Sequence, residues 1–279
     1  MMSFESEKLA PDTWRINGSG CTAYLVCGEE EGAMIDTGDS SENIRAYAES
    51  LCGKPVRTVL NTHGHFDHTG GNGFFNVAIM GKLAKEIAKE PNGGQPIEEY
   101  PLDYPIVTVD DGFTIDFGNR EFEAFRMDGH SPDCIAWLDK RERILFTGDN
   151  VNMVPMKYKC VDPQPSMLLY MQSVAKLLTR REEYDWILVG HGRELISADQ
   201  VNHTMMAALR ALDGELDQMS PPQHRPGEVR PGSHKNDHGP DFSKHDPADN
   251  GFIEYKDARI MFNKRYLKDT TRYNVVKGT

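Results

Sequence analysis

The alternation of apolar and polar positions in the amino-terminal third predicts strands followed by a helix. Two or three strands are expected within residues 13–37, because short apolar runs there flank an acidic turn. Apolar side chains then recur at helical spacing over 41–52, and Gly53 is a typical helix stop. A buried strand over 56–60 and a short helix over 81–90 are predicted next.

The middle of the chain is predicted to be rich in strands and to end in helices. Residues 106–147 alternate in the manner of antiparallel strands, and the sequence Asp-Asp-Gly at 110–112 suits a hairpin turn. An amphipathic helix is expected over 167–180, a short buried strand over 186–189 and another helix over 198–212. Each strand-rich half is therefore followed by helices.

Two segments lack this periodicity. Residues 91–105 are rich in proline, so we expect a loop there that forms part of a substrate rim. Over 214–250, proline, glycine, histidine and aspartate dominate, which predicts a long loop or a partly disordered linker. A strand or hairpin over 252–262 suggests a tail that docks on the body or on a second subunit. We therefore divide the chain into a main domain, 1–213, and an extension, 214–279.

Composition and charge narrow the range of partners. The 279 residues are 38% hydrophobic, enough for a real core, and a net charge of -12 disfavours nucleic-acid binding through a general basic surface. No apolar stretch approaches the roughly 18–20 residues that span a membrane, and the amino terminus lacks a signal-peptide pattern. The five cysteines are scattered, so reduced thiols and a cytoplasmic location are expected. A bond between Cys21 and Cys27, on one face of a strand, would be awkward.

A histidine-rich run follows the strand predicted over 56–60. His63, His65, Asp67 and His68 place four side chains that can bind metal within six positions. So short a run cannot stack two helical turns, which excludes the helical zinc motif with histidines at i and i+4. The run is expected to be a loop past the strand end, where alternate side chains can turn toward two neighbouring metal positions.

This run and four further motifs resemble those of the metallo-β-lactamase superfamily, in the family's order. The further motif residues are Asp36 in Ala-Met-Ile-Asp-Thr-Gly, His130 in Asp-Gly-His-Ser-Pro, Asp149 in Phe-Thr-Gly-Asp and His191 in Val-Gly-His-Gly. The resemblance implies an α+β fold, the four-layer αββα sandwich. Two sheets would pack face to face with helices outside and metals at one edge, followed by a C-terminal extension.

The resemblance also implies two divalent metal ions that share a carboxylate and a hydroxide. By resemblance, the ligands are His63, His65 and His130 for the first metal, Asp67, His68 and His191 for the second, and Asp149 as the bridge. Zn2+ is the expected metal, with Fe and Mn as alternatives. Three neutral imidazoles leave a zinc ion one open position, and two metals about 3.5–4 Å apart can share such a bridge.

The same resemblance assigns roles to single residues. A metal-bridging hydroxide would attack an electrophilic carbonyl or phosphorus atom, and the catalytic Asp67 would orient it and take its proton. Asp149 would act as the second catalytic carboxylate through both metals. Asp36 lies outside the metal shell in the family, so it would hold the metal loop through hydrogen bonds.

Two residues after the third motif depart from the family pattern. Asp133 replaces a common glycine, and Cys134 stands where many glyoxalase II-like members carry His or Ser. Cys134 is expected to pack beneath the site, with a role near the second metal as the alternative. Lys157, Tyr158 and Lys159 are candidates for the substrate pocket, or for a solvated basic turn.

The favoured function is hydrolysis of an ester, thioester or lactone by a dinuclear zinc site, since both metal positions have complete ligand sets. Asp149 also differs from the Cys or Ser usual in true zinc β-lactamases. The first alternative is a persulfide dioxygenase with one iron held by His63, His130 and Asp149. The second is a phosphodiesterase. The expected partner is a small-molecule substrate, with no nucleic acid and no membrane, and the extension is a candidate surface for a homodimer.

Overall fold

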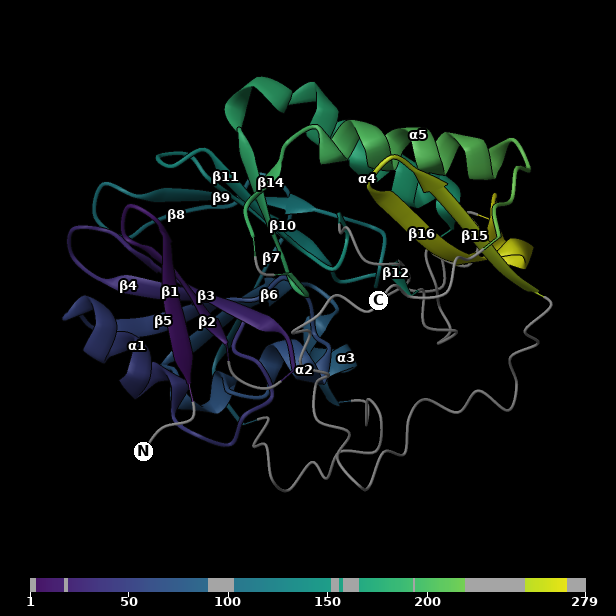
Figure 1. Ribbon diagram of the computed structural model, residues 1–279. Helices are drawn as coiled ribbons and strands as arrows, with labels where there is room; N and C mark the ends of the chain where they lie inside the picture. Colours follow the sequence, from purple (N-terminus) through teal and green to yellow (C-terminus); the bar gives the residue numbers. More distant parts are fainter. Residues whose placement is uncertain are drawn as a thin grey trace.

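Two β-sheets pack face to face and carry helices on their outer faces (Figure 1). The structure is a computed structural model, and it describes residues 4–17, 20–89, 103–151, 156–157, 166–192, 194–218 and 249–269. None of the helices within these ranges is long and apolar enough to cross a membrane.

The first sheet holds seven strands of the described chain in sequential order. They are β1 (Glu5–Ala10), β2 (Thr13–Asn17), β3 (Thr22–Cys27), β4 (Gly32–Ile35), β5 (Val56–Leu60), β6 (Val77–Gly81) and β7 (Ile106–Val109). β1 to β4 pair antiparallel, whereas β4 to β7 pair parallel. Parallel neighbours share the edge at which their carboxyl ends lie, so the loops after β4 and β5 meet there.

The second sheet is mostly antiparallel. Its described strands are β8 (Thr114–Asp116), β9 (Glu121–Arg126), β10 (Ile135–Asp139), β11 (Ile144–Gly148), β13 (Trp186–Val189) and β14 (Ile196–Ser197). The spatial order is β14-β13-β11-β10-β9-β8, and β11 and β13 pair parallel. The segments after β11 and β13 therefore leave the sheet at the same edge.

Five α-helices occur in the described residues. They are α1 (Ile44–Cys52), α2 (Phe66–Thr69), α3 (Ala84–Lys89), α4 (Met167–Thr179) and α5 (Gln200–Leu212). The Asn43 side chain accepts a hydrogen bond from the Ala46 amide at the start of α1, and Gly53 ends that helix at a φ of 69°. Ser166 caps α4 in the same way, through the Leu169 amide.

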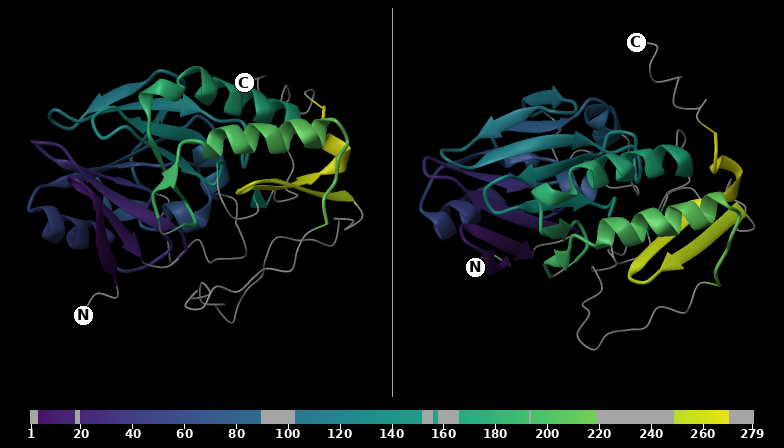
Figure 2. Two further views of the ribbon diagram at one scale, coloured as in Figure 1. Left: turned by 45° about the horizontal axis from the view of Figure 1, so that its top comes forward. Right: turned by 90° about the horizontal axis from the view of Figure 1, so that it is seen from above.

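Three apolar clusters correspond to the three interfaces between four layers. The first lies between the sheets and includes Tyr24, Leu60, Phe122 and Trp137. A second cluster lies under α1, and a third lies under α4 and α5. The two further views show the helices on opposite outer faces (Figure 2). The predicted αββα sandwich is confirmed.

A buried arginine joins the two sheets. Arg120, at the start of β9, contacts the Asp139 carboxylate of β10 at 2.5 Å, and both side chains are fully buried. The same guanidinium donates to the Asp12 carbonyl, in the turn between β1 and β2, at 2.5 Å and to the Thr13 hydroxyl, at the start of β2, at 2.6 Å. Removal of one partner from such a pair would leave a charge buried without compensation.

The C-terminal hairpin docks on the body of its own chain. β15 (Asn250–Tyr255) and β16 (Ala258–Asn263) form a small sheet with β12 (Met156–Lys157) and lie beside α5 (Figures 1 and 2). Ile253, Ile260 and Phe262 belong to the same apolar cluster as α4 and α5. The predicted strand or hairpin is confirmed, and its docking partner is α5.

Several local predictions were wrong. Residues 106–109 were expected to start an antiparallel set, but they form β7, which pairs parallel with β6 in the first sheet. The metal run was expected to be a loop throughout, but its second half forms the one-turn helix α2. Trp186, in a strand predicted to be buried, is 46% exposed. Strands β1, β6, β12 and β14 were not predicted.

Some expectations concern residues that the structure does not describe. These are most of the proline-rich segment 91–105, most of the linker 214–250, and both Tyr158 and Lys159. Lys157 is described through its backbone alone, in β12.

Candidate metal centre

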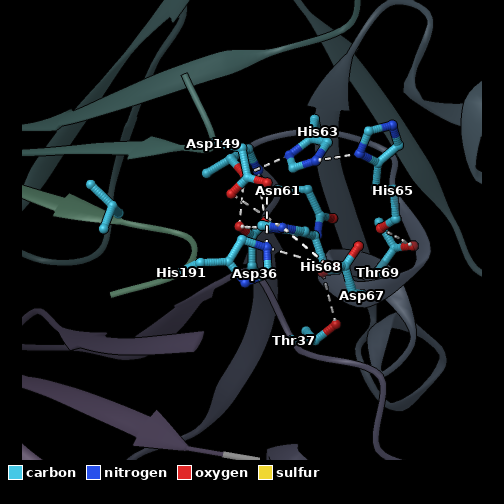
Figure 3. Close-up of polar contacts among 12 residues, drawn as sticks. Asp36, Thr37, Asn61, His63, His65, Asp67, His68, Thr69, Asp149 and His191 are labelled. Atoms are coloured by element: carbon cyan, nitrogen blue, oxygen red, sulfur yellow. Dashed lines mark hydrogen bonds and ion pairs between the residues drawn. The ribbon is translucent and has the colours of Figure 1, made fainter. Parts of the chain in front are cut away.

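Seven predicted ligands converge at one edge of the sandwich, where strands of both sheets end. Figure 3 labels all of them except His130. The first sheet contributes the segment after β5, which includes α2. The second sheet contributes the turn between β9 and β10 and the ends of β11 and β13. The residues are His63, His65, Asp67, His68, His130, Asp149 and His191. The structure brings all seven together, and that they bind metal stays a prediction.

His63, His65 and His130 form a group that we call the three-histidine site. The His63 Nε2 atom lies 2.9 Å from Nδ1 of His65, and His130 Nε2 lies 2.9 Å from the same atom. All three residues are buried. Burial, followed by the neighbouring charge of His68, lowers the pKa of His63 well below its ordinary value, so His63 is neutral and its ring can bind a metal.

Asp67, His68 and His191 form a second group that we call the mixed site. Asp67 Oδ2 lies 3.3 Å from His191 Nε2 and 3.9 Å from His68 Nε2. Burial opposes ionisation of Asp67, but the charges of His68 and His191 outweigh it and hold the pKa of this carboxyl well below its ordinary range. Asp67 is therefore a carboxylate at neutral pH, as a metal ligand must be.

The Asp149 carboxylate lies between the two groups. Its Oδ2 atom is 3.6 Å from His130 Nε2 and 3.3 Å from His191 Nε2, and its Oδ1 atom is 3.6 Å from His68 Nε2. Burial disfavours the charge, yet His191 and His68 lower the pKa of Asp149 far below its ordinary value. Oδ2 thus faces one histidine of each group, and Oδ1 faces a histidine of the mixed site. A bridging ligand would lie in this position.

The donor atoms fit a pair of cations. Nε2 of His68 and Oδ1 of Asp149 are buried and make no hydrogen bond within the described part of the chain. An unpaired buried polar atom costs about 1–3 kcal/mol, so such atoms in a native site call for a ligand. Imidazole nitrogens and carboxylate oxygens are the donors that zinc and neighbouring metals prefer.

Asp36 follows β4 and holds His68 from the side away from the ligand cluster (Figure 3). Its Oδ2 atom lies 2.8 Å from His68 Nδ1 and accepts a 2.7 Å hydrogen bond from the Thr62 hydroxyl. Its Oδ1 atom accepts from the Thr62 amide at 2.8 Å. Burial opposes protonation of His68, but Cys21 and then Asp36 raise its pKa well above the ordinary value, so a metal bound at Nε2 would have to displace a proton from the ring. The contact sets which nitrogen of His68 faces the ligand cluster.

A set of buried polar residues that the sequence reasoning missed supports the metal loop. Asn61 donates to the His68 carbonyl at 3.0 Å, and Asn72 donates to Asn61 Oδ1 at 2.8 Å. The Thr37 hydroxyl lies 3.2 Å from the same His68 carbonyl. Asn61 and Thr37 each adjoin a motif, so their place beside it was the available signal.

Asn150 was missed in the same way, although it directly follows Asp149. Its Oδ1 atom accepts a 2.9 Å hydrogen bond from the His130 amide, and its carbonyl accepts one from the Tyr170 hydroxyl of α4. This side chain therefore fixes the loop of His130 relative to the end of β11.

Cys134 packs behind the His130 loop. It is fully buried, belongs to the apolar cluster under α4, and lies 3.2 Å from the Ser131 hydroxyl. Burial raises the pKa of its thiol above the ordinary value. The structure favours the packing role over the metal role considered for this residue. Cys21 and Cys27 are free thiols.

The side chains of the centre differ in exposure. The side chains of Asp67 and His191 are 32% and 33% exposed, whereas those of His68 and Asp149 are 0% and 12% exposed. Asp67 and His191 are thus more exposed than the other two side chains.

Comparison with known sequences identifies the family. The sequence profile of the metallo-beta-lactamase superfamily matches residues 16–191, which include all the ligands described above. The chain belongs to this superfamily.

Several curated relatives match part of the chain. The chain is 28% identical over 167 residues to the human acyl-coenzyme A thioesterase MBLAC2, across 48% of this chain and 60% of that protein. It is 31% identical over 158 residues to an atrochrysone carboxyl ACP thioesterase of Aspergillus terreus, across 52% of this chain and 45% of that protein. The matches thus span less than two thirds of the relatives' lengths.

Solved structures of the same fold are also similar. A metallo-beta-lactamase from Pontibacter korlensis superposes with a TM-score of 0.61 at 18% identity, over 74% of this chain and 99% of that chain. DIM-1 metallo-beta-lactamase gives a TM-score of 0.61 at 18% identity, over 75% and 98%. These likenesses concern the fold.

Proposed function

We propose that the protein is a metal-dependent hydrolase of carboxylic thioesters, with esters and lactones as related substrates. The observation that carries the proposal is the Asp149 carboxylate, whose two oxygens face two complete groups of metal-binding side chains. The names of two relatives supply the substrate class, because an acyl-coenzyme A ester and an acyl-carrier-protein ester are both thioesters.

The residues of the centre fit the chemistry of hydrolysis. Divalent metals bound here would lower the pKa of a water molecule and polarise the substrate carbonyl. The seven side chains hold their positions through neighbours such as Asp36 and Asn150, so their donor atoms are oriented before a substrate binds. Precise placement of this kind contributes to catalysis because the reacting groups need not reorganise.

We assign a proton-transfer role to Asp67. Its carboxylate is ionised, as argued above, and it lies on the exposed side of the centre next to His191. In thioester hydrolysis the oxygen of water bonds to the acyl carbon, the carbon–sulfur bond breaks, and the thiolate leaves. Asp67 would accept the proton of that water and return it to the leaving sulfur.

The first experiment combines metal content with a thioesterase assay. About two divalent metal ions per chain, measured by inductively coupled plasma mass spectrometry, are expected on a two-site centre. Release of coenzyme A from acyl-coenzyme A substrates, followed with a thiol reagent, should exceed cleavage of simple esters and lactones. His63→Ala and Asp67→Ala should abolish it, and His203→Ala, a histidine of α5, should not. Normal turnover by either site variant would overturn the proposal.

An iron dioxygenase remains the main alternative function. His63, His130 and Asp149 would hold its single metal, and all three side chains lie in the observed centre. The complete mixed site argues for the two-metal hydrolase instead. One iron per chain, with oxygen uptake on a persulfide substrate and no thioesterase activity, would favour the alternative. The phosphodiesterase prediction is tested in the same screen with a phosphodiester substrate.

A further inference from the structure

Asp133 is a buried acidic residue to which the mechanism assigns no part. It lies between His130 and β10 and is 2% exposed. Its Oδ2 atom accepts a 2.5 Å hydrogen bond from the Gly64 amide, and its Oδ1 atom accepts a short one from the Ser131 hydroxyl. One carboxylate therefore contacts the segment of His63 and His65 and also the loop of His130.

The Gly64 backbone is enclosed on two sides. A Cβ atom added to this glycine would lie 2.5 Å from the Ala84 carbonyl oxygen at the start of α3 and 3.1 Å from Asp133 Oδ2. No real Cβ atom tolerates the first distance, so only glycine fits here without a shift. The peptide between His63 and His65 is thus held between α3 and Asp133.

Asp133 is itself immobilised by its backbone. A Cβ atom added to Gly81, the last residue of β6, would lie 2.0 Å from the Asp133 carbonyl oxygen. Two residues further on, the Ile135 amide donates to the Thr62 carbonyl at 2.7 Å. The segment that carries Asp133 therefore runs beside the segment 62–64 and is bound to it at both ends.

The mixed site has a different support. His68 is held by Asp36 through its ring and by Asn61 through its carbonyl. The carbonyl of Asp67, its neighbour on α2, accepts a 3.2 Å hydrogen bond from the Cys21 amide. Asp133 therefore contacts a support of the three-histidine site, through Gly64 and Ser131. The two supports meet at the Thr62 hydroxyl, which donates to Asp36 and lies 3.1 Å from His63 Nδ1.

We propose that Asp133 is a positioning residue that sets the metal affinity of the three-histidine site independently of the mixed site. Its carboxylate fixes the peptide between His63 and His65 and, through Ser131, the loop that carries His130. This inference depends on the proposed function in one respect, which is that both sites bind metal. Groups behind metal ligands commonly change metal affinity by about 10–100-fold.

The test measures zinc affinity separately at each site by competition with a chromophoric chelator. His191→Ala impairs the mixed site, and His130→Ala impairs the three-histidine site. Asp133→Ala added to the His191→Ala chain should raise the zinc Kd about 10–100-fold. Added to the His130→Ala chain, it should leave the Kd unchanged within error.

Two further variants separate positioning from general stability. Asp133→Asn keeps an oxygen that can accept from Gly64, so it should recover most of the affinity. Ser131→Ala removes one contact and should weaken the same site less than Asp133→Ala does. The control is Asp139→Asn, a buried carboxylate of β10 that contacts Arg120, which should lower the melting temperature without a site-specific change in Kd.

The outcomes distinguish this inference from the proposed function. The role of Asp133 would be overturned by equal losses of zinc affinity in both backgrounds, or by no loss of zinc affinity in the His191→Ala background. If Asp133→Ala fails to fold, then Ser131→Ala decides the question by the same comparison, because its smaller loss of zinc affinity should occur in the His191→Ala background alone. A parent chain that binds two zinc ions while Asp133→Ala behaves normally leaves the proposed function standing. A parent chain that binds no zinc overturns both.

Discussion

At the scale of single residues, Asp36 combines an unusual backbone with three buried contacts. Its φ is 55°, in the left-handed region that Asp and Asn tolerate better than most residues. That conformation turns the side chain toward Thr62 and His68, both of which it contacts within 2.8 Å. The backbone conformation and the side-chain contacts of Asp36 therefore both orient His68.

Replacement of Asp36 should weaken the mixed site. Asp36→Ala leaves the His68 ring and the Thr62 groups without their partner, so metal affinity should fall about 10–100-fold and stability by about 1–3 kcal/mol. Zinc competition and chemical denaturation measure the two effects. Asp12→Ala is the matched control, because Asp12 also has a positive φ, 50°, and lies away from the centre. Unchanged zinc affinity in Asp36→Ala would contradict the role.

At the scale of elements, a charged cluster fixes the end of α4 against the second sheet. Arg180 follows α4 and contacts Glu123 of β9 through two nitrogens, at 3.1 and 3.2 Å, and it also pairs with Glu183. The hydrogen bonds from Arg180, aided by Lys140, lower the pKa of Glu123 below its ordinary 4.5. The carboxylate form of Glu123 is therefore bound more tightly in the folded state than in the unfolded state.

The stability due to Glu123 should depend on pH in one direction. A lowered folded-state pKa means that the contribution is present above the ordinary pKa and is lost as the pH falls through the lowered one. Glu123→Gln should cost up to about 1 kcal/mol at neutral pH, because the pair is partly exposed. Denaturation at several pH values should show this difference shrinking toward zero in acid. Glu5→Gln, at an exposed position on β1, is the matched control. A stability difference between Glu123→Gln and the parent chain that stays constant with pH would refute the contribution of the Glu123–Arg180 pair.

At the scale of the whole molecule, the C-terminal hairpin completes the core of the second half. Ile253 and Ile260 are paired across β15 and β16 and are both buried in the cluster of α4 and α5. Arg210 of α5 donates to the Glu254 carbonyl at 2.5 Å, and the Asp217 amide donates to the Phe252 carbonyl at 2.8 Å. The hairpin therefore packs as part of the body, whereas the division at residue 213 and a homodimer through the extension stay predictions.

Loss of the hairpin core should destabilise the protein. Ile253→Ala should lower the free energy of unfolding by about 2–5 kcal/mol, because it leaves a cavity among packed side chains. Val107→Ala, at a residue that is 46% exposed, should change it by about 0.5 kcal/mol or less. Deletion of residues 214–279 should lower the melting temperature further. If neither change alters stability, oligomer size or activity, the docking of the hairpin is not structurally important.

The sequence alone identified the candidate ligands of the centre and most elements of the fold. Metal-binding side chains are recognisable by type, and the resemblance of their motifs to those of the family predicted that they would lie at one edge of the sheets. The helix over 41–52 was predictable because its apolar stripe and its stop at Gly53 are local features. The ligand motifs and the helical pattern each depend on residues that lie close together in the chain.

Only the tertiary structure decided which strands are partners and which polar groups meet. β7 resembled its neighbours in sequence but joined the other sheet, because an apolar pattern reports burial and not the identity of the partner. The contact of Asp133 with Gly64 joins residues that are far apart in the chain, and so does the packing of Ile253 beneath α5. Such contacts depend on the packed arrangement of the elements, which local patterns do not contain.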